Sequence, residues 1–594
     1  MTPAEYYETH ITLYNCRLKQ VKQHRNLATT GKLLIFAGFV FQIYWFISIG
    51  GWFFLSFFPT VGLFILLSVI DNRIVRKLRL TAELIRINQE EREYLNGSLD
   101  NFPTGQEYLD PGHPYAADRD SFGGVSLFQH LNRTVTSRGT DLLADWLLHL
   151  SKDPTTICKR QQAAAELARY PEWCQLFRAE GKLRPLQKMD FDILKQWQEE
   201  PAFFLHPRTT RIWLYTVNGL SLLSWAAVAL GWCPWPLASA LFFGQLLVLS
   251  LYQKKINSHH RKLDSFIGTV SQYLPLVRSV CRQSFASPWL QELKKTFSSS
   301  GQNALKAFRQ LKSIHEKLDQ RGNILIAFLL NGLYLKDIHT MLELDRWKKE
   351  YRCRIDDWIQ TLGTMDALVS MANYRLNHPA YAEPRIGGTR LLEAYGAGHP
   401  LLTANHKVTN DFHIDGLHRL FIVTGANMAG KSTFLRTIGI NLVLAQSGNV
   451  VDSSSFNFQP MALFTSMRTT DNLAKNTSYF HAELLRLKQL VLMAEKEERL
   501  FVILDEMLKG TNSVDKLNGS LAFLRKLLAY PVSGLIATHD LALGELANAY
   551  PENFFNVCFE ITHSGESVRY DYKLHPGIST TMNASILLKQ MGLI

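Results

Sequence analysis

A glycine-rich segment around residue 425 has the composition of a loop that binds nucleotide phosphates. It fits the pattern G-x-x-x-x-G-K-[ST] and runs Gly425-Ala426-Asn427-Met428-Ala429-Gly430-Lys431-Ser432, followed by Thr433. The backbone N–H groups of such a loop, and the N-terminus of the helix after it, carry partial positive charge and can surround phosphates. We expect residues 425–433 to bind ATP, with Lys431 at the β- and γ-phosphates and Ser432 as a ligand of Mg²⁺.

Acidic residues and a histidine further along the chain could complete a hydrolytic site. The continuous apolar run Leu500–Leu504 ends in Asp505 and Glu506. We expect Asp505 to hold the Mg²⁺ ion through water, and Glu506 to orient and deprotonate the attacking water. A second run, Leu535–Thr538, ends at His539, which we expect to sense the γ-phosphate. The predicted catalytic residues are therefore Lys431, Glu506 and His539.

These groups need particular elements to position them. The glycine-rich loop must lie between a strand, predicted at Leu420–Val423, and a helix that begins near Lys431. The two apolar runs are typical of strands in a buried parallel sheet. We therefore predict that residues 399–594 form an α/β ATPase domain.

Together these motifs resemble the MutS family of ATPases. The resemblance rests on TGANMAGKSTFLR at 424–436, DEMLKGTNSVD at 505–515 and ATHD at 537–540, with Ala429 where the family usually has glycine. DNLAKNTSYFHAE at 471–483 resembles the signature that contacts the nucleotide of a partner subunit. Ser478, Phe480 and Glu483 match that signature, whereas Asn476 stands at a usual glycine. The resemblance implies a homodimer in which Ser478 acts on the partner's ATP.

The resemblance also covers part of the chain before the ATPase domain, and it implies a partner. Residues 126–147 and 364–376 resemble the core and lever helices of the family, which grip DNA in a dimeric clamp. The mismatch-reading and connector domains of the family have no counterpart in the resemblance. We therefore expect that any DNA is bound without mismatch specificity. Lys407 occupies the position at which the family usually stacks an aromatic residue on adenine.

Two long stretches without a formal charge predict membrane-spanning hairpins. Residues 33–70 are interrupted at Gly50-Gly51, and residues 212–253 are interrupted at Gly231–Pro236. Each half approaches the roughly 20 residues that a spanning helix needs. Neither stretch contains Asp, Glu, Lys, Arg or His, which ion and proton pathways usually need. We therefore interpret the hairpins as anchors or packing elements, and this disfavours a transporter.

The net charge of +12 is concentrated beside these hairpins. Residues 19–32, 71–79, 208–211 and 254–262 contain fourteen Lys and Arg residues and one Asp residue, so the remainder is close to neutral. Positive charge at the bases of the hairpins, and none at their tips, predicts an integral protein of the cytoplasmic (inner) membrane with cytoplasmic soluble domains. The neutral remainder gives no strong signal for nucleic acid. The seven cysteines form no C-x-x-C pair and so indicate neither a zinc site nor a disulfide framework.

The predicted fold combines membrane helical hairpins, an α-helical core and lever region, and a C-terminal P-loop α/β ATPase domain of the ABC type. We divide the chain into a cytoplasmic lead at 1–32, a first hairpin at 33–70, a helix and linker at 71–124, core helices at 125–207, a second hairpin at 212–253, lever helices at 254–398 and the ATPase domain at 399–594. The uncharged run Asn323–Leu335 is too short to span a membrane, and we predict a buried helix there.

Two functions remain open from the sequence. The first is a membrane-anchored, dimeric MutS-like ATPase whose levers act in a DNA transaction, such as DNA binding or repair, at the membrane. The second is an ATP-driven membrane-remodelling or signalling protein that does not bind DNA. The second hairpin interrupts the lever region itself, which favours the alternative, whereas the family resemblance favours DNA.

Overall fold

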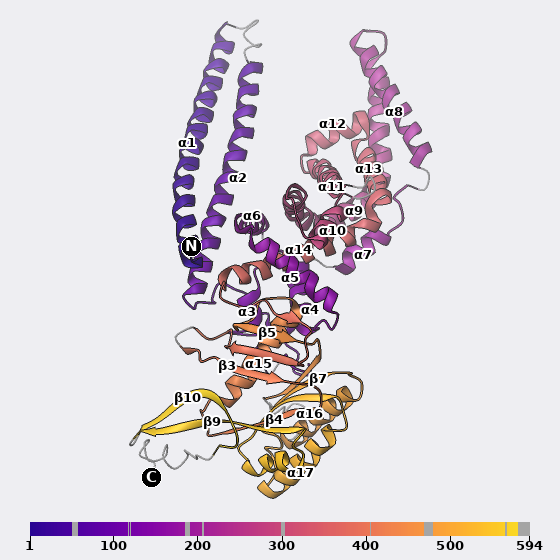
Figure 1. Cartoon of the computed structure of the whole chain (residues 1–594). Coiled ribbons are helices and arrows are strands. Elements are labelled where there is room, and N and C mark those ends of the chain that lie inside the picture. Colours follow the sequence, from indigo (N-terminus) through magenta and orange to yellow (C-terminus); the bar gives the residue numbers. More distant parts are fainter. Residues whose placement is uncertain are drawn as a thin grey trace.

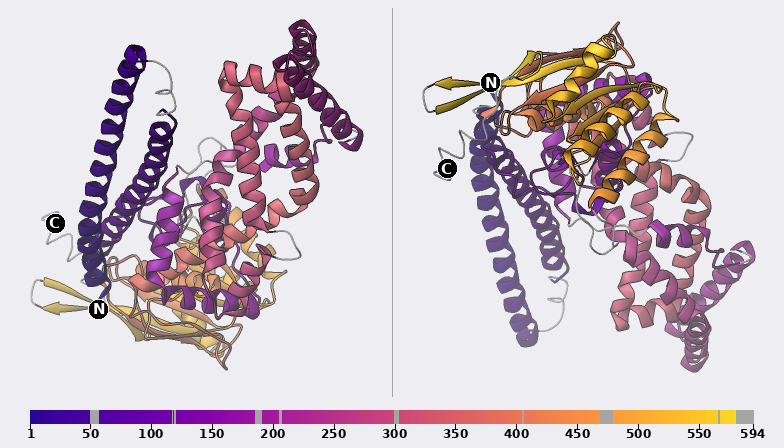
Figure 2. Two further views of the ribbon diagram at one scale, coloured as in Figure 1. Left: turned by 90° about the horizontal axis from the view of Figure 1, so that it is seen from above. Right: turned by 90° about the horizontal axis from the view of Figure 1, so that it is seen from below.

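The structure is a computed structural model that describes residues 1–49, 57–116, 118, 120–184, 191–204, 207–298, 303–403, 406–467, 479–564 and 567–579. Two helical hairpins extend from a helical region toward one side of the molecule, and an α/β domain lies on the opposite side (Figure 1). Two views at right angles to the first show the same separation (Figure 2). The predicted combination of mostly helical structure with a C-terminal α/β region is confirmed.

The first hairpin consists of α1, Pro3–Ile49, and α2, Phe57–Leu95. The helix α1 begins well before the apolar stretch, so residues 3–32 of the predicted lead belong to the same helix. Within the apolar part, the amide of Gln42 donates to the hydroxyl of Thr60 at 2.9 Å. At its edge, Lys32 forms an ion pair with Asp71. These paired polar groups hold the two helices together.

The second hairpin consists of α8, Pro207–Ala229, and α9, Trp235–Arg282, and its turn lies where the sequence predicted it. Together α1, α2, α8 and α9 are the four helices, among the described residues, that are individually long and apolar enough to cross a membrane. The lower half of α9 continues into the helical region, so a single helix joins the hairpin to the rest of the protein (Figure 1).

The prediction of a buried helix at Asn323–Leu335 is wrong. The helix α12, Ile324–Tyr334, exposes its apolar side chains, including Ile324 at 83% and Leu325 at 68%. It lies against the second hairpin, where the rings of Phe242 and Phe328 are 5.1 Å apart. The chain then turns by 80° into the next helix. The sequence predicted burial because the run is uncharged, but its surroundings are the apolar hairpin rather than a protein core.

The remaining helices form the core and lever region. They are α3 Leu127–Leu131, α4 Ser137–Leu148, α5 Pro154–Ala168, α6 Pro171–Lys182, α7 Phe191–Glu199, α10 Pro288–Thr296, α11 Ala304–Asp319, α13 Lys336–Tyr351 and α14 Ile355–Asn377. The helix α14 is almost wholly buried and packs against α4 and α5. The segments 126–147 and 364–376, which are far apart in the chain, therefore lie side by side.

The lower ends of both hairpins, here called their stems, meet at residues 132–136 between α3 and α4. In the first stem, Glu91 of α2 is completely buried, and its Oε1 lies 2.7 Å from Arg133 Nε and 2.7 Å from Arg178 Nη2. In the second stem, the side-chain amide of Gln272 on α9 donates to the carbonyl oxygen of Val135 at 2.8 Å. One short segment is thus bonded to both apolar hairpins.

The same segment is fixed to α14 by a buried carboxylate. Asp366 accepts hydrogen bonds from the backbone N–H of Thr136 at 2.7 Å and from its hydroxyl at 2.6 Å. A Cβ atom at Gly139 would lie 2.4 Å from the Asp366 carboxylate, so only glycine allows this approach. Thr136 also caps α4 by accepting from the N–H of Gly139. The start of α4 is therefore held by α14 and by both stems.

The α/β domain contains two sheets. The smaller has the order β1-β5-β2-β3 and the larger has the order β10-β9-β4-β8-β7-β6, parallel except for the β9–β10 hairpin. The strands are β1 Arg385–Ile386, β2 Leu392–Ala397, β3 Asn410–Ile414, β4 Leu420–Gly425, β5 Ser455–Phe458, β6 Ala462–Ser466, β7 Leu500–Asp505, β8 Val532–Ala537, β9 Phe554–Ser564 and β10 Ser567–Pro576. The helices are α15 Lys431–Ser447, α16 Tyr479–Ala494, α17 Ser513–Leu527 and α18 Leu546–Ala549. The predicted boundary at 399 falls between β2 and β3 of one sheet.

The helix α15 connects this domain to the helical region. It is buried along nearly its whole length and packs against α4 and α5. At its C-terminal end, a Cβ atom at Gly448 would lie 2.6 Å from the Cβ of Arg160 in α5. Near its start, Arg436 pairs with Asp120 at 3.1 Å. The helix α15 therefore contacts α4, which begins directly after the 132–136 segment.

Candidate nucleotide-binding site

The loop between β4 and α15 has the conformation that its glycines allow. Gly425 has φ 144° and Gly430 has φ 105°, and both values are unfavourable for other residues. A Cβ atom at Gly425 would lie 2.7 Å from the carbonyl oxygen of Phe559, so the loop passes close to β9. Met428 is 77% exposed at the outer turn, whereas Ala429 is buried. The alanine at this usual glycine position is accommodated within the loop.

Lys431 lies inside this loop at the start of α15. Its Nζ donates to the carbonyl oxygens of Gly425 at 2.8 Å and Ala426 at 2.9 Å. Burial lowers the pKa of Lys431 to about 8, although the nearby carboxylates of Asp505 and Glu506 act in the opposite direction. A phosphate in the loop would replace these carbonyl partners with a full negative charge, which favours the charged lysine.

The predicted catalytic residues meet at the carboxyl ends of three neighbouring strands. The loop follows β4, His539 follows β8, and Asp505 and Glu506 end β7. His539 Nε2 lies 3.3 Å from Lys431 Nζ and 2.8 Å from Glu506 Oε1. The sheet order β4-β8-β7 therefore places the histidine between the lysine and the glutamate. This order could not be predicted from the sequence.

Glu506 is held ionised in a strained turn. Its φ of 54° lies in the left-handed region, and its backbone N–H donates to Ala537 at 3.0 Å. The hydrogen bond from His539 is the main reason that the pKa of Glu506 falls to about 2. The ionised carboxylate can accept a proton from water, and the neighbouring strand fixes where that carboxylate lies.

The predicted metal ligands come from two different elements of the α/β domain. Ser432 is in the first turn of α15, and Asp505 is the last residue of β7. Their donor atoms are a hydroxyl and a carboxylate, and hard oxygen donors of this kind suit Mg²⁺. The residues present therefore fit a magnesium ion that also binds phosphate oxygens.

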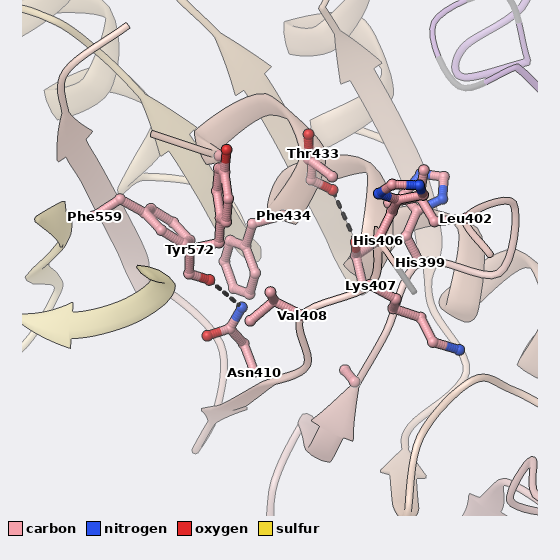
Figure 3. A pocket seen from close by; sticks show the side chains of 13 residues that line it. His399, Leu402, His406, Lys407, Val408, Asn410, Thr433, Phe434, Phe559 and Tyr572 are labelled. Carbon is pink, nitrogen blue, oxygen red and sulfur yellow. Dashed lines mark hydrogen bonds between the residues drawn. The ribbon is translucent and has the colours of Figure 1, made fainter. Parts of the chain in front are cut away.

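A pocket of about 470 Å³ opens beside the phosphate loop (Figure 3). It is lined by residues from the loop and α15 and by side chains of Leu402, His406, Val408, Asn410, Phe559 and Tyr572. Lys407 also lines this space, and its Nζ bonds Asp452 at 2.7 Å (Figure 3). Tyr572 contributes an aromatic ring to the same pocket, and no sequence motif indicated it. The register of β9 and β10 shifts around Tyr572, and its φ of 53° marks the bulge.

The second half of the 471–483 signature contacts the loop that follows Glu506. Glu483 of α16 accepts from the backbone N–H of Leu508 at 2.6 Å and from that of Lys509 at 3.0 Å. A Cβ atom at Gly510 would lie 2.9 Å from the Cβ of Phe480. Burial raises the pKa of Glu483, although the two amides oppose this. Ser478 and Asn476 lie outside the described residues, so the role of Ser478 remains a prediction.

Comparison with known proteins supports the assignment of this domain. A family model described as MutS domain V matches residues 421–589. Similar proteins include MutS protein homolog 4 of Homo sapiens, 25% identical over 304 residues, which cover 50% of this chain and 30% of that protein. The DNA mismatch repair protein MSH3 of Phaeosphaeria nodorum is 32% identical over 235 residues, which cover 38% of this chain and 20% of that protein. The DNA mismatch repair protein MutS of Thermotoga neapolitana is 29% identical over 227 residues, which cover 37% of this chain and 27% of that protein.

Residues 421–589 of this chain match domain V of the MutS family. The match to domain V starts in β4 and includes the phosphate loop, Asp505, Glu506 and His539. The resemblance to this family that the motifs indicated is therefore confirmed. The chain matches less than a third of the length of each of these relatives.

Proposed function

We propose that this chain is an ATPase that hydrolyses ATP in a homodimer and transmits the resulting motion to two membrane hairpins. The observation that carries the proposal is the row Lys431, His539 and Glu506 at three adjacent strand ends. Such a row joins a phosphate-binding cation to a carboxylate that can activate water. ATP would lie with its phosphates in the 425–430 loop and its base in the pocket beside Tyr572.

Mg²⁺ would bind between Ser432, Asp505 and the phosphates, where it neutralises charge that develops during hydrolysis. Lys431 would then exchange its hydrogen bonds to the carbonyl oxygens of Gly425 and Ala426 for bonds to the nucleotide phosphates. His539 would orient Glu506 toward water, and from the same position it would contact the γ-phosphate and so sense its presence. In the homodimer, Ser478 of each subunit would reach the nucleotide of the other subunit.

The route from ATP to the membrane is a continuous series of packed elements. The helix α15 starts at the phosphate loop and packs against α4 and α5, and α4 starts beside the 132–136 segment. That segment is bonded to Glu91 of the first stem and to Gln272 of the second. We propose that closing two ATPase domains on each other shifts α4 and α5, and that both stems follow.

We further propose that the hairpins span a cytoplasmic membrane and that α12 lies against its lipid. Both hairpins project on the same side (Figures 1 and 2), which suits one planar bilayer. The exposed apolar side chains of α12 continue the apolar surface of the second hairpin. Asn218 of α8 donates to the carbonyl oxygen of Tyr334 at 3.0 Å, so the end of α12 is fixed to that hairpin.

Native cysteines allow this topology to be tested. Cys233 lies at the turn of the second hairpin, whereas the exposed Cys16 and Cys353 lie on the cytoplasmic side of our topology. In intact cells, a membrane-impermeant thiol reagent should label a chain that retains only Cys233, but not chains that retain only Cys16 or Cys353. After the membrane is opened, the latter two should react, whereas a lone cysteine at Leu325 should stay slow because lipid covers it. Labelling of Cys16 in intact cells would contradict the proposed topology and place the N-terminal end of α1 outside the cytoplasm.

The lever region would act on DNA at the membrane or on the membrane itself. The names of the relatives, which include DNA mismatch repair proteins, favour DNA. The attachment of the lever region to both hairpins favours remodelling of the membrane or signalling across it. We propose a DNA transaction without mismatch preference as the first function, because the helices that resemble the MutS core and levers are predicted to form a clamp on DNA.

The ATPase rate of the detergent-purified protein separates the two functions. We expect duplex or branched DNA to change the rate, with the effect falling as salt rises, since phosphate contacts dominate such binding. A single mismatch should change the affinity less than about tenfold, or about 1.4 kcal/mol, relative to homoduplex. If no DNA alters the rate while liposomes do, the membrane function replaces the DNA function.

A further inference from the structure

Two histidine–aspartate pairs face each other where α9 leaves the second hairpin. His260 and Asp264 are four residues apart on α9, and His315 and Asp319 are four residues apart on α11. Residues four apart lie on one face of a helix, so each pair presents a nitrogen and an oxygen donor together. One donor atom from each of the four residues can be chosen so that all four lie within 4.8 Å of one another. This is the cluster of metal-ligating side chains found among the described residues.

The spacing of these atoms is close to that of a tetrahedral metal centre. Zinc bonds to nitrogen and oxygen are about 2.0–2.2 Å long, which puts neighbouring ligands about 3.3–3.6 Å apart in a tetrahedron. His260 Nε2 lies 3.2 Å from Asp319 Oδ1 and 3.5 Å from Asp264 Oδ1. His315 Nε2 lies 2.6 Å from Asp264 Oδ1, and the other ring nitrogen of His315, Nδ1, lies 3.3 Å from Asp319 Oδ2. Small side-chain rotations would therefore bring one atom of each residue to a common ion.

The helices beneath the cluster are held in place by a packed core. Leu263 of α9 and Leu311, Ile314 and Leu318 of α11 are all buried. The backbone positions of the four side chains are therefore set before any ligand arrives, which lowers the cost of assembling a site. Two imidazoles and two carboxylates are a donor set that suits zinc and related divalent transition metals.

We propose that His260, Asp264, His315 and Asp319 bind a divalent transition-metal ion of the zinc class. The ion joins α9 to α11 about seven residues beyond the apolar part of α9, which is roughly 10 Å along a helix. It therefore fastens the membrane hairpin to the helix that leads directly into α12. Without the ion, hydrogen bonds between the same groups join α9 to α11. The ion stabilises the packed arrangement of the two helices further, because it binds only when all four side chains are together.

The proposed metal ion has a structural role, because all four of its ligand atoms belong to the protein. A centre with four protein ligands leaves no open position for water or substrate. The two aspartates are exposed, so an ion can enter from solvent. The cluster lies outside the nucleotide site, and its ligands are nitrogen and oxygen donors rather than the oxygen-only set at Ser432 and Asp505.

Metal content of the full-length protein tests the proposal. The chain is purified in detergent without a polyhistidine tag, treated with a chelator, loaded with zinc and desalted. We expect about one tightly held zinc ion per chain, and about none in His260→Ala and His315→Ala. Cobalt in place of zinc should give the visible absorption of a tetrahedral centre in the parent, and this absorption should vanish in both variants.

A matched control comes from a single pair elsewhere. His149 bonds Asp145 at 2.8 Å, four residues before it, and among the described residues this pair is not part of a cluster of three or more metal-ligating side chains. His149→Ala should keep the zinc and the cobalt spectrum. Asp264→Asn keeps the shape of its side chain and should also lose the ion while the protein remains monodisperse. A parent without bound zinc, or equal zinc content in the parent and in both histidine variants, overturns the proposal and leaves a hydrogen-bonded cluster only.

Discussion

Replacing Glu506 with glutamine should leave ATP binding intact and slow hydrolysis by about 10²–10⁴-fold, the usual contribution of one general base. The carboxylate acts on water and does not hold the nucleotide, whereas its amide counterpart cannot accept the proton. The expected result is a chain that retains ATP after desalting. The measurement is the single-turnover rate of ATP hydrolysis together with the amount of nucleotide that co-purifies.

Lys431→Ala is the control for this experiment. It removes the cation that our assignment places at the phosphates, so ATP binding itself should be lost. His539→Ala should resemble Glu506→Gln more than Lys431→Ala, because His539 bonds Glu506 at 2.8 Å. Equal turnover by Glu506→Gln and the parent would remove Glu506 from the catalytic role.

Replacing Glu91 with alanine should lower the free energy of unfolding by about 3–5 kcal/mol, the usual cost of removing one partner from a buried ion pair. The change leaves the guanidinium groups of Arg133 and Arg178 buried without the carboxylate they share. It also removes the acceptor of the Asn377 amide at 2.9 Å. The measurement is denaturant unfolding of the detergent-purified protein.

An exposed pair in the same stem provides the comparison. Glu8 of α1 lies 4.0 Å from Arg92 of α2, and its side chain is 72% exposed. Glu8→Ala should cost less than about 1 kcal/mol because solvent screens the pair. If Glu91→Ala proves as mild as Glu8→Ala, the buried cluster does not hold the first stem to the core.

Local patterns predicted the parts of this protein that local chemistry determines. The phosphate loop, the strand that ends in Asp505 and the turn of the second hairpin each depend on neighbouring residues, and each lies where we expected it. The grouping of Lys431, His539 and Glu506 followed from the carboxyl ends of neighbouring strands. Their order, with His539 between the other two, required the strand order of the sheet.

Contacts between distant residues could not be predicted in the same way. Asp366 bonds the N–H of Val135, which is 231 positions away, and nothing near either residue signals the other. Tyr572 enters the nucleotide pocket through a bulge that no motif marks. The exposed helix α12 was assigned to a core because uncharged runs are usually buried, and only its place beside the apolar hairpin shows otherwise.

The measurement that tests our account most directly is the distance between the tips of the second hairpins of the two subunits in a dimer. A chain that keeps only Cys233 of its seven cysteines, in the Glu506→Gln background, carries one spin label at each tip. Pulsed electron paramagnetic resonance then gives the distance between labels with and without ATP. Our account predicts a distribution that shifts when ATP binds, and that fails to shift when Lys431→Ala is added. An unchanged distribution in a dimer that has bound ATP would contradict the proposed coupling of the α/β domain to the hairpins.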